Sequence, residues 1–146
     1  MASGSVAVVT GAGTGIGKAV ASALVAAGWR VAFAGRRPEP LAAAIAAAGG
    51  GERAIAVSTD VTRPDSVDAL FARTVPRLRA AFADGAINAP ALVTTLNYWG
   101  YLRRTLGDSA AAEAHFREAL GLADALAPED FFRISTTQSV LASTLA

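Results

Sequence analysis

Four glycines at alternating positions separate an apolar run from a helix-like run in VVTGAGTGIGKAV, residues 8–20. Glycine has no Cβ, so a backbone of this kind lets another group approach closely. At a turn from a strand into a helix that group is commonly a phosphate, because the helix start offers free N–H groups and a partial positive charge. The segment therefore predicts a phosphate-binding loop.

Three loop patterns can be compared with this segment. The P-loop pattern G-x-x-x-x-G-K-[ST] fails at Ala12 and Ala19, and the pattern G-x-G-x-x-G fails at Ile16. The variant T-G-x-x-x-G-x-G matches at every place, with Thr10, Gly11, Gly15 and Gly17. In this variant of the dinucleotide-binding turn, Gly11 makes the tight turn, Gly15 lets the backbone approach a pyrophosphate and Gly17 lets the helix pack close to the sheet. The expected cofactor contacts of the loop are Gly11, Gly13, Thr14, Gly15, Ile16 and Gly17.

The elements that must position this loop alternate between strand and helix over the first half of the chain. Short β-branched runs predict strands, whereas alanine-rich runs that end in glycines or follow a proline predict helices. The expected strands are residues 5–10, 30–35 and 53–61, and the expected helices are residues 18–28, 41–51 and 63–75. This order predicts an α/β fold with parallel strands and right-handed crossovers.

Two arginines follow the second expected strand, where a dinucleotide fold reads the adenosine ribose. An acid at this place accepts a hydrogen bond from the ribose 2′-hydroxyl, whereas an arginine receives a 2′-phosphate. Arg36 and Arg37 occupy the place, and the first acid is Glu39. A charge-assisted bond contributes about 1.5–3 kcal/mol, so the pattern favours NADP over NAD. NAD remains an alternative, as does the interpretation that both arginines are merely solvated.

Residues 5–75 resemble the start of the short-chain dehydrogenases/reductases, on the glycine loop, the AGRR sequence and the TDV sequence after the third strand. The resemblance implies an NAD(P)-binding module of an oxidoreductase. It implies half of a Rossmann-type doubly wound parallel sheet, with three strands in the order 3-2-1. It also implies that the Asp60 side chain and the Val61 backbone hold the adenine edge. The alternative for Asp60 is a cap on the following turn.

The catalytic pair that this resemblance implies is missing from the sequence. The family's chemistry uses Tyr-x-x-x-Lys, in which the lysine lowers the pKa of the tyrosine. Lys18 is the only lysine in the sequence, and it lies in the glycine loop. Arginine is a poor substitute because its pKa is too high to tune, and His115 beside Phe116 on an alanine-rich helix is more typical of a surface or core-edge residue. We therefore assign no catalytic residue and expect cofactor binding without catalysis by this chain alone.

Beyond residue 76 the sequence predicts an all-helical C-terminal part. The expected helices are residues 91–107, 109–126 and 131–146. Residues 93–146 resemble a tetratricopeptide-like segment, with Gly100 where two helices approach and Phe116 on the packing face. A helical-repeat module for protein interaction is therefore the alternative function, with the N-terminal half as scaffold.

The two halves resemble different families, and each is incomplete. We expect two parts, residues 1–75 and 76–146, with the boundary placed only within 75–90, and we expect a truncated or fused reading frame. The first strand's outer edge would be unpaired, so self-association or a protein partner is expected there or at the helical segment.

The composition excludes several classes of function. The absence of cysteine rules out disulfides and thiolate chemistry, and a single histidine argues against a zinc site. A net charge of +1 gives no electrostatic basis for binding nucleic acid or an anionic membrane. The apolar runs are far shorter than the roughly 20 residues of a membrane span, and no signal peptide is evident. We therefore expect a cytoplasmic protein.

Overall fold

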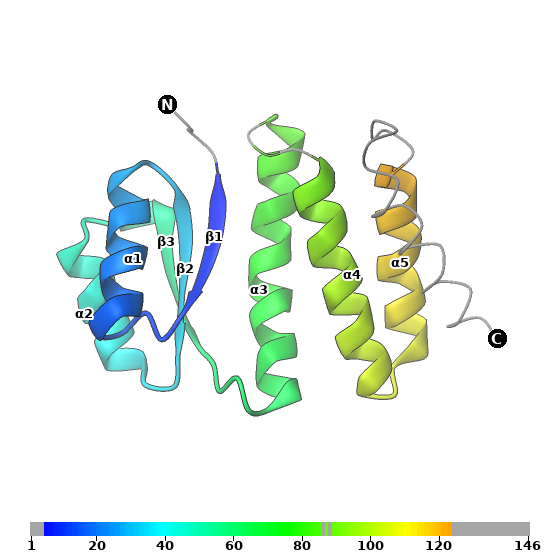
Figure 1. Ribbon diagram of the computed structural model, residues 1–146, viewed down its shortest axis with the longest axis horizontal. Helices are drawn as coiled ribbons and strands as arrows, with labels where there is room; N and C mark the ends of the chain where they lie inside the picture. The colour runs from blue at the N-terminus through cyan, green and yellow to red at the C-terminus, as the bar shows by residue number, and fades with distance from the viewer. Residues whose placement is uncertain (1–4, 86, 88, 124–146) are drawn as a thin grey trace. The chain divides into compact units, whose positions relative to one another are not determined.

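The structure, a computed structural model, describes residues 5–85, 87 and 89–123. The chain divides into two compact units, Met1–Ile87 and Asn88–Ala146. The first unit combines a sheet with helices, and the described part of the second is helical (Figure 1). This division falls within the interval 75–90 in which the sequence places the boundary, whereas the extents 1–75 and 76–146 stay a prediction.

Three parallel strands form the sheet of the first unit: β1 (Val6–Thr10), β2 (Arg30–Gly35) and β3 (Ala54–Ser58). Their spatial order is β1-β2-β3, which confirms the predicted half of a Rossmann-type doubly wound parallel sheet with order 3-2-1. The central strand β2 is buried from Val31 to Ala34. Within the described residues, no strand pairs with the outer edge of β1.

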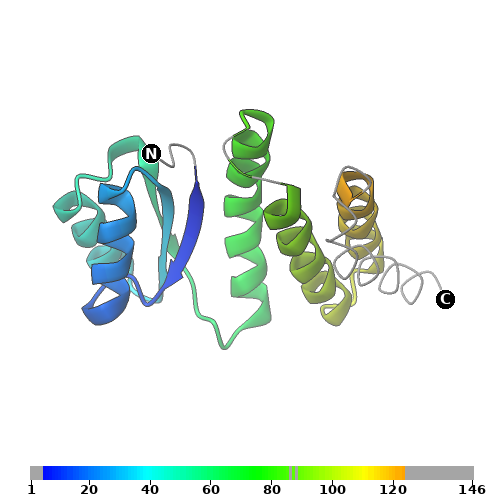
Figure 2. The same cartoon turned by 45° about the horizontal axis from the view of Figure 1, so that its top comes forward.

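Helices cover both faces of this sheet (Figures 1 and 2). On one face, α1 (Gly15–Ala26) and α2 (Pro38–Ala47) pack around the fully buried Phe33. On the other face, α3 (Pro64–Ala83) packs through Leu70 against Ala34 and Val57. A short 3₁₀ helix, η1 (Gly51–Arg53), leads into β3. Because side chains alternate along a strand, β2 contributes to both cores.

The helix α3 is longer than the sequence predicts. The expected helix ends at residue 75, but α3 passes through Pro76 and ends at Ala83. A proline inside a helix removes one backbone hydrogen bond. The buried positions Leu78 and Ala81 continue the helical spacing of the buried Leu70 and Thr74 beyond this proline. Burial of this apolar face therefore outweighs the lost hydrogen bond.

The described part of the second unit is a hairpin of two helices, α4 (Ala89–Thr105) and α5 (Ser109–Ala123). The two helices approach closely at Gly100, where a Cβ would lie 2.5 Å from Cε1 of the buried Phe116. The expected helix 131–146 and the rest of the tetratricopeptide-like segment beyond residue 123 lie outside the described residues. Among the helices that the structure describes, none is long and apolar enough to cross a membrane.

Candidate functional site

The loop between β1 and α1 presents backbone, not bulky side chains, at the carboxyl edge of the sheet. Gly11 and Gly15 have φ angles of 65° and 55°, in the left-handed region that strains other residues. The N–H of Ala12 donates to the carbonyl oxygen of Ala34 at 3.1 Å. The loop is thereby fastened to the end of β2, and its backbone is exposed to the space beyond the sheet.

The first turn of α1 is left without side-chain caps. Thr14, the N-cap residue, has an extended backbone and makes no capping hydrogen bond, and the first turn holds no acidic residue. The first backbone bond of the helix runs from the N–H of Lys18 to the carbonyl oxygen of Thr14, at 3.2 Å. The preceding N–H groups, of Gly15, Ile16 and Gly17, make no such bond to the described chain. They can therefore bind an anion.

The start of α1 lies directly against the loop that precedes it. A Cβ at Gly17 would lie 2.4 Å from the carbonyl oxygen of Gly11 and 2.9 Å from that of Thr10. Both neighbours are backbone atoms, which cannot move aside without displacing the loop. The sequence predicts close helix packing at Gly17, and the structure leaves no room for a larger residue there.

Two cavities open at this edge of the sheet. The first has a volume of about 510 Å³ and lies between the glycine loop and the start of α2. The second, of about 360 Å³, lies at the carboxyl ends of the three strands. The first is lined by Gly11, Gly13, Thr14, Gly35, Arg36, Arg37, Pro40 and Leu41. The second is lined by Thr10, Gly11, Ala34, Gly35, Arg36, Thr59, Asp60, Val61 and Thr62.

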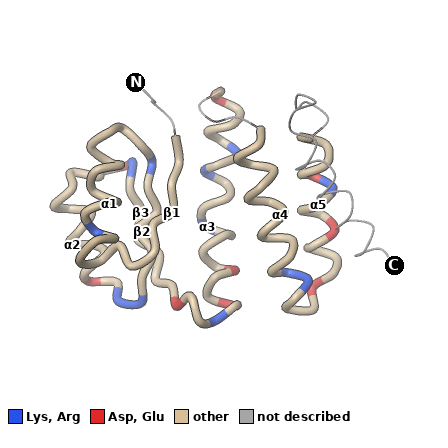
Figure 3. The backbone as a smooth tube through the Cα atoms, viewed as in Figure 1, with Lys and Arg blue, Asp and Glu red and all other residues tan. Residues whose placement is uncertain are grey.

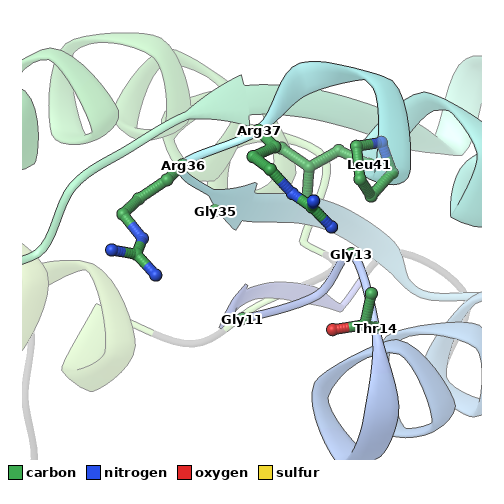
Figure 4. Close-up of a pocket in the computed structure, with 8 residues that line it drawn as sticks. Gly11, Gly13, Thr14, Gly35, Arg36, Arg37 and Leu41 are labelled. Atoms are coloured by element: carbon green, nitrogen blue, oxygen red, sulfur yellow. The ribbon is translucent and has the colours of Figure 1, made fainter.

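Arg36 and Arg37 leave the end of β2 in different directions (Figure 4). The guanidinium of Arg37 extends toward Gly13, whereas that of Arg36 extends away from it. The charge of Arg36 acts instead on Asp60, whose pKa it helps to lower. Neither guanidinium forms an ion pair with the part of the chain that the structure describes. Both arginines line the first cavity and Arg36 also lines the second, so each cavity has positive charge on its wall.

Asp60 is held by the turn that follows β3. Its Oδ1 accepts hydrogen bonds from the N–H of Thr62 at 3.0 Å and from the Thr62 hydroxyl at 2.7 Å. These bonds, with smaller effects of the charges of Arg36 and Arg63, lower the pKa of Asp60 below its ordinary value. The turn-capping role that the sequence left open is therefore present, while Oδ2 has no hydrogen-bond partner among the described residues.

Replacing Thr62 by valine is expected to raise the pKa of Asp60 toward its ordinary value. The hydroxyl bond of Thr62 is the largest cause of the lowered pKa, and valine cannot form it. The backbone bond of residue 62 also lowers this pKa, and it depends on the turn that the hydroxyl supports. A lowered pKa stabilises the fold above the unfolded-state pKa, and this stabilisation is lost as pH falls through the folded-state pKa. Carboxyl NMR titration measures the shift. Ser58→Ala, which removes a hydroxyl bonded to the carbonyl oxygen of Arg36 instead, is the control. An unchanged Asp60 titration in the valine variant would contradict the assignment.

Most of the predicted cofactor residues line the two cavities. Gly15, Ile16 and Gly17 lie instead in the first turn of α1, where Ile16 is 85% exposed. Val61 lies at the second cavity and is 63% exposed. The sequence did not predict the lining residues Ala34, Gly35, Pro40, Leu41, Thr59 and Thr62.

A recognisable signal existed for the missed residues at the start of α2. The helix was expected from residue 41, but it begins at Pro38, a residue type favoured in the first turn. Reading that proline as a helix start would have placed Pro40 and Leu41 beside the loop. The described residues contain no cluster of His, Cys, Asp and Glu that could hold a metal ion.

Comparisons with known proteins agree on the first unit. The family model described as short chain dehydrogenase matches residues 5–88. A 2,5-dichloro-2,5-cyclohexadiene-1,4-diol dehydrogenase from Sphingobium indicum is 41% identical over 92 residues, 62% of this chain and 34% of the relative. A probable oxidoreductase from Streptomyces antibioticus is 49% identical over 70 residues, 46% of this chain and 23% of the relative. The chain thus spans about a third or less of these relatives.

A solved structure supports the same fold over a longer stretch. A short chain dehydrogenase from Bacillus anthracis matches with a TM-score of 0.53 and covers 82% of this chain and 53% of its own. Its sequence is 17% identical, so the likeness concerns the fold alone.

Proposed function

The chain belongs to the short-chain dehydrogenase family, and from this we propose that its first unit binds a nicotinamide dinucleotide at the carboxyl edge of the sheet. The observation that carries the proposal is the uncapped start of α1 beside the glycine loop. A pyrophosphate placed there accepts from the N–H groups of Gly15, Ile16 and Gly17 and meets the positive end of the helix dipole. Gly13 and Thr14, which line the first cavity, complete the loop around it.

The adenine is assigned to the second cavity. Asp60 and Val61 line it, and Oδ1 of Asp60 is already held by Thr62. The carboxylate is therefore fixed in orientation and ionised at neutral pH, and Oδ2 remains to accept from an amino group. The Val61 backbone lies beside it at the cavity wall.

The cofactor we propose is NADP, with NAD as the second choice. Arg36 and Arg37 supply positive charge at the end of β2, and Asp60 is the one acid among the described residues that line the two cavities. Arginine forms charge-assisted, often paired hydrogen bonds with phosphate oxygens. A 2′-phosphate beside Arg37 is thus favoured over a bare hydroxyl.

We propose that this chain by itself binds the cofactor without turning over a substrate. The oxidoreductase chemistry implied by the family moves hydride to or from the nicotinamide while a tyrosine, assisted by a lysine, passes a proton. The sequence holds one lysine, Lys18, and it lies within α1 at the proposed pyrophosphate site. The match covers 34% and 23% of the two relatives, so we place the substrate site in residues outside this match.

The alternative function is a tetratricopeptide-like interaction module. The observation in its favour is the exposure of Tyr98 and Tyr101 on α4, at 66% and 38%, beside the tight packing of Gly100 on Phe116. Aromatic side chains on a helix surface are typical of sites that bind proteins. The edge of β1 is a second place where a protein partner or another copy of the chain would bind. In either function we propose a cytoplasmic protein that binds neither nucleic acid nor membrane.

Titration of the purified protein with NADPH and NADH, followed by nicotinamide fluorescence, separates the two functions. The cofactor proposal predicts saturable binding, with NADPH bound more tightly than NADH. No saturable binding at millimolar cofactor would overturn it and leave the interaction module. Turnover of carbonyl or alcohol substrates would overturn the proposal that this chain is not catalytic.

The variant Gly15→Ala is expected to weaken NADPH binding by about tenfold. Its φ of 55° costs an L-residue about 1–2 kcal/mol, so the alanine variant relaxes away from the geometry that aims the N–H groups. Gly85→Ala is the matched control: the φ of Gly85 is 70°, no atom of the described residues lies within 4 Å of its Cβ position, and it follows α3 outside both cavities. The control should lose similar stability and keep its cofactor affinity. Equal affinities in both variants would contradict the site.

A further inference from the structure

A third cavity, of about 350 Å³, lies at the opposite end of the strands from the glycine loop. Three arginines from three different elements line it: Arg30 begins β2, Arg53 ends η1 and Arg77 belongs to α3. Figure 3 shows basic positions at the amino ends of β2 and β3 and along α3. The cavity thus lies between the amino edge of the sheet and α3, within the first unit.

Positive charge exceeds negative charge around this cavity. Among the described residues, Glu52 is the one carboxylate on its wall, against three guanidinium groups. With the described residues, none of the three arginines forms a salt bridge; Arg77 donates only to the carbonyl oxygen of Arg73, at 3.0 Å. Like charges around a partly enclosed space repel one another more strongly than in open solvent. An anion bound there relieves this repulsion.

The floor of the cavity is apolar. Ala32 is a buried residue of β2, and Ile55 packs beside it from β3. The hydroxyl of Thr74, also on the wall, is already donated to the carbonyl oxygen of Leu70 at 2.8 Å. The space therefore combines cationic donors at its rim with an apolar base, and its volume falls within the range of small-molecule sites, about 300–1,000 Å³.

We propose that this cavity binds a small phosphate monoester whose organic group is apolar. Guanidinium groups match phosphate oxygens in geometry and form paired, charge-assisted hydrogen bonds with them. The phosphate lies among Arg30, Arg53 and Arg77, and the organic group lies against Ala32 and Ile55. The site is separate from the proposed pyrophosphate site, since the two lie at opposite ends of β2 and share no lining residue.

Isothermal titration calorimetry of the protein with phenyl phosphate at constant ionic strength tests the proposal, and phenol is the uncharged comparison. We expect saturable binding of phenyl phosphate and none of phenol. Arg77→Gln should weaken binding by about tenfold, the effect of one charge-assisted hydrogen bond. Arg73→Gln, an exposed arginine one turn away that does not line the cavity, should change it by less than about twofold. If Arg77→Gln does not fold, the exposed Arg53→Gln takes its place.

Three results would overturn the site. The first is the absence of saturable phenyl phosphate binding. The second is an equal loss of phenyl phosphate affinity in Arg77→Gln and Arg73→Gln, which would mean that binding depends on the net charge of the surface and not on this cavity. The third is loss of binding in an Arg36→Gln/Arg37→Gln double variant, which would place the anion at the carboxyl edge instead. This last arm also separates failure here from failure of the dinucleotide proposal.

Discussion

Replacing Gly17 by alanine is expected to remove measurable dinucleotide binding and to lower the free energy of unfolding. The added Cβ would lie 2.4 Å from the carbonyl oxygen of Gly11, 2.7 Å from its carbonyl carbon and 2.9 Å from the carbonyl oxygen of Thr10. These are backbone atoms on one side of α1, so the helix start must move away from the loop. Overpacking of this kind costs about 1–3 kcal/mol.

The same movement displaces the N–H groups that we assign to the pyrophosphate. Each charge-assisted hydrogen bond contributes about 1.5–3 kcal/mol, and the loss of two weakens binding by about a hundredfold or more. Thermal unfolding measures the stability, and titration with NADPH measures the affinity. Both should fall together.

The control for Gly17 is the same substitution in a helix that has room for it. Gly121 is an exposed residue of α5, and no atom of the described residues lies within 4 Å of its Cβ position. Gly121→Ala should therefore keep or raise stability, by up to about 1 kcal/mol, through helix propensity alone. Wild-type affinity in Gly17→Ala would show that the start of α1 does not hold the cofactor.

The glycine loop shows how far the sequence predicts this site and where it stops. The spacing of Gly11, Gly15 and Gly17 identified the turn and the close approach of the helix, and the structure has both. The predicted helix start was wrong because of the same glycines: the helix was expected from Lys18, but α1 begins at Gly15. Propensity disfavours glycine inside a helix. Position 17 is nevertheless a glycine within α1, because its contact with the loop leaves no room for a larger residue.

The third strand shows a different limit. It was expected to continue to residue 61, but β3 ends at Ser58. Thr59 still donates its N–H to the carbonyl oxygen of Gly35 at 2.9 Å, and Asp60 then turns the chain by accepting from Thr62. This turn forms the wall of the second cavity. It depends on one side-chain contact two residues along, which a β-branched run does not reveal.

The directions of the Arg36 and Arg37 side chains could not be predicted from the sequence, from which both arginines were expected to bind the same 2′-phosphate. Figure 4 separates them, with the Arg37 side chain extending toward Gly13 and the Arg36 side chain extending away from it. Adjacent residues after a strand leave the backbone on different sides, because successive side chains alternate. Their roles in the proposed site therefore differ.

Arg37→Gln is expected to weaken NADPH binding by tenfold or more and to leave NADH binding nearly unchanged. Its guanidinium extends toward Gly13 in the first cavity, where the ribose phosphate is proposed to lie. The loss of one charge-assisted hydrogen bond, about 1.5–3 kcal/mol, falls only on the cofactor that carries the 2′-phosphate. The measured quantity is the ratio of the two dissociation constants, from parallel fluorescence titrations.

Arg36→Gln is the matched control, since it removes the same charge from the neighbouring position. Arg36 acts on Asp60 and lines both cavities, so its loss should weaken NADPH and NADH by similar factors and leave their ratio close to that of the wild type. It should also raise the pKa of Asp60 slightly, as Arg36 helps to lower it. If Arg36→Gln alone changes the ratio, the 2′-phosphate lies at the second cavity. If neither variant changes it, the positive charge after β2 does not select the cofactor.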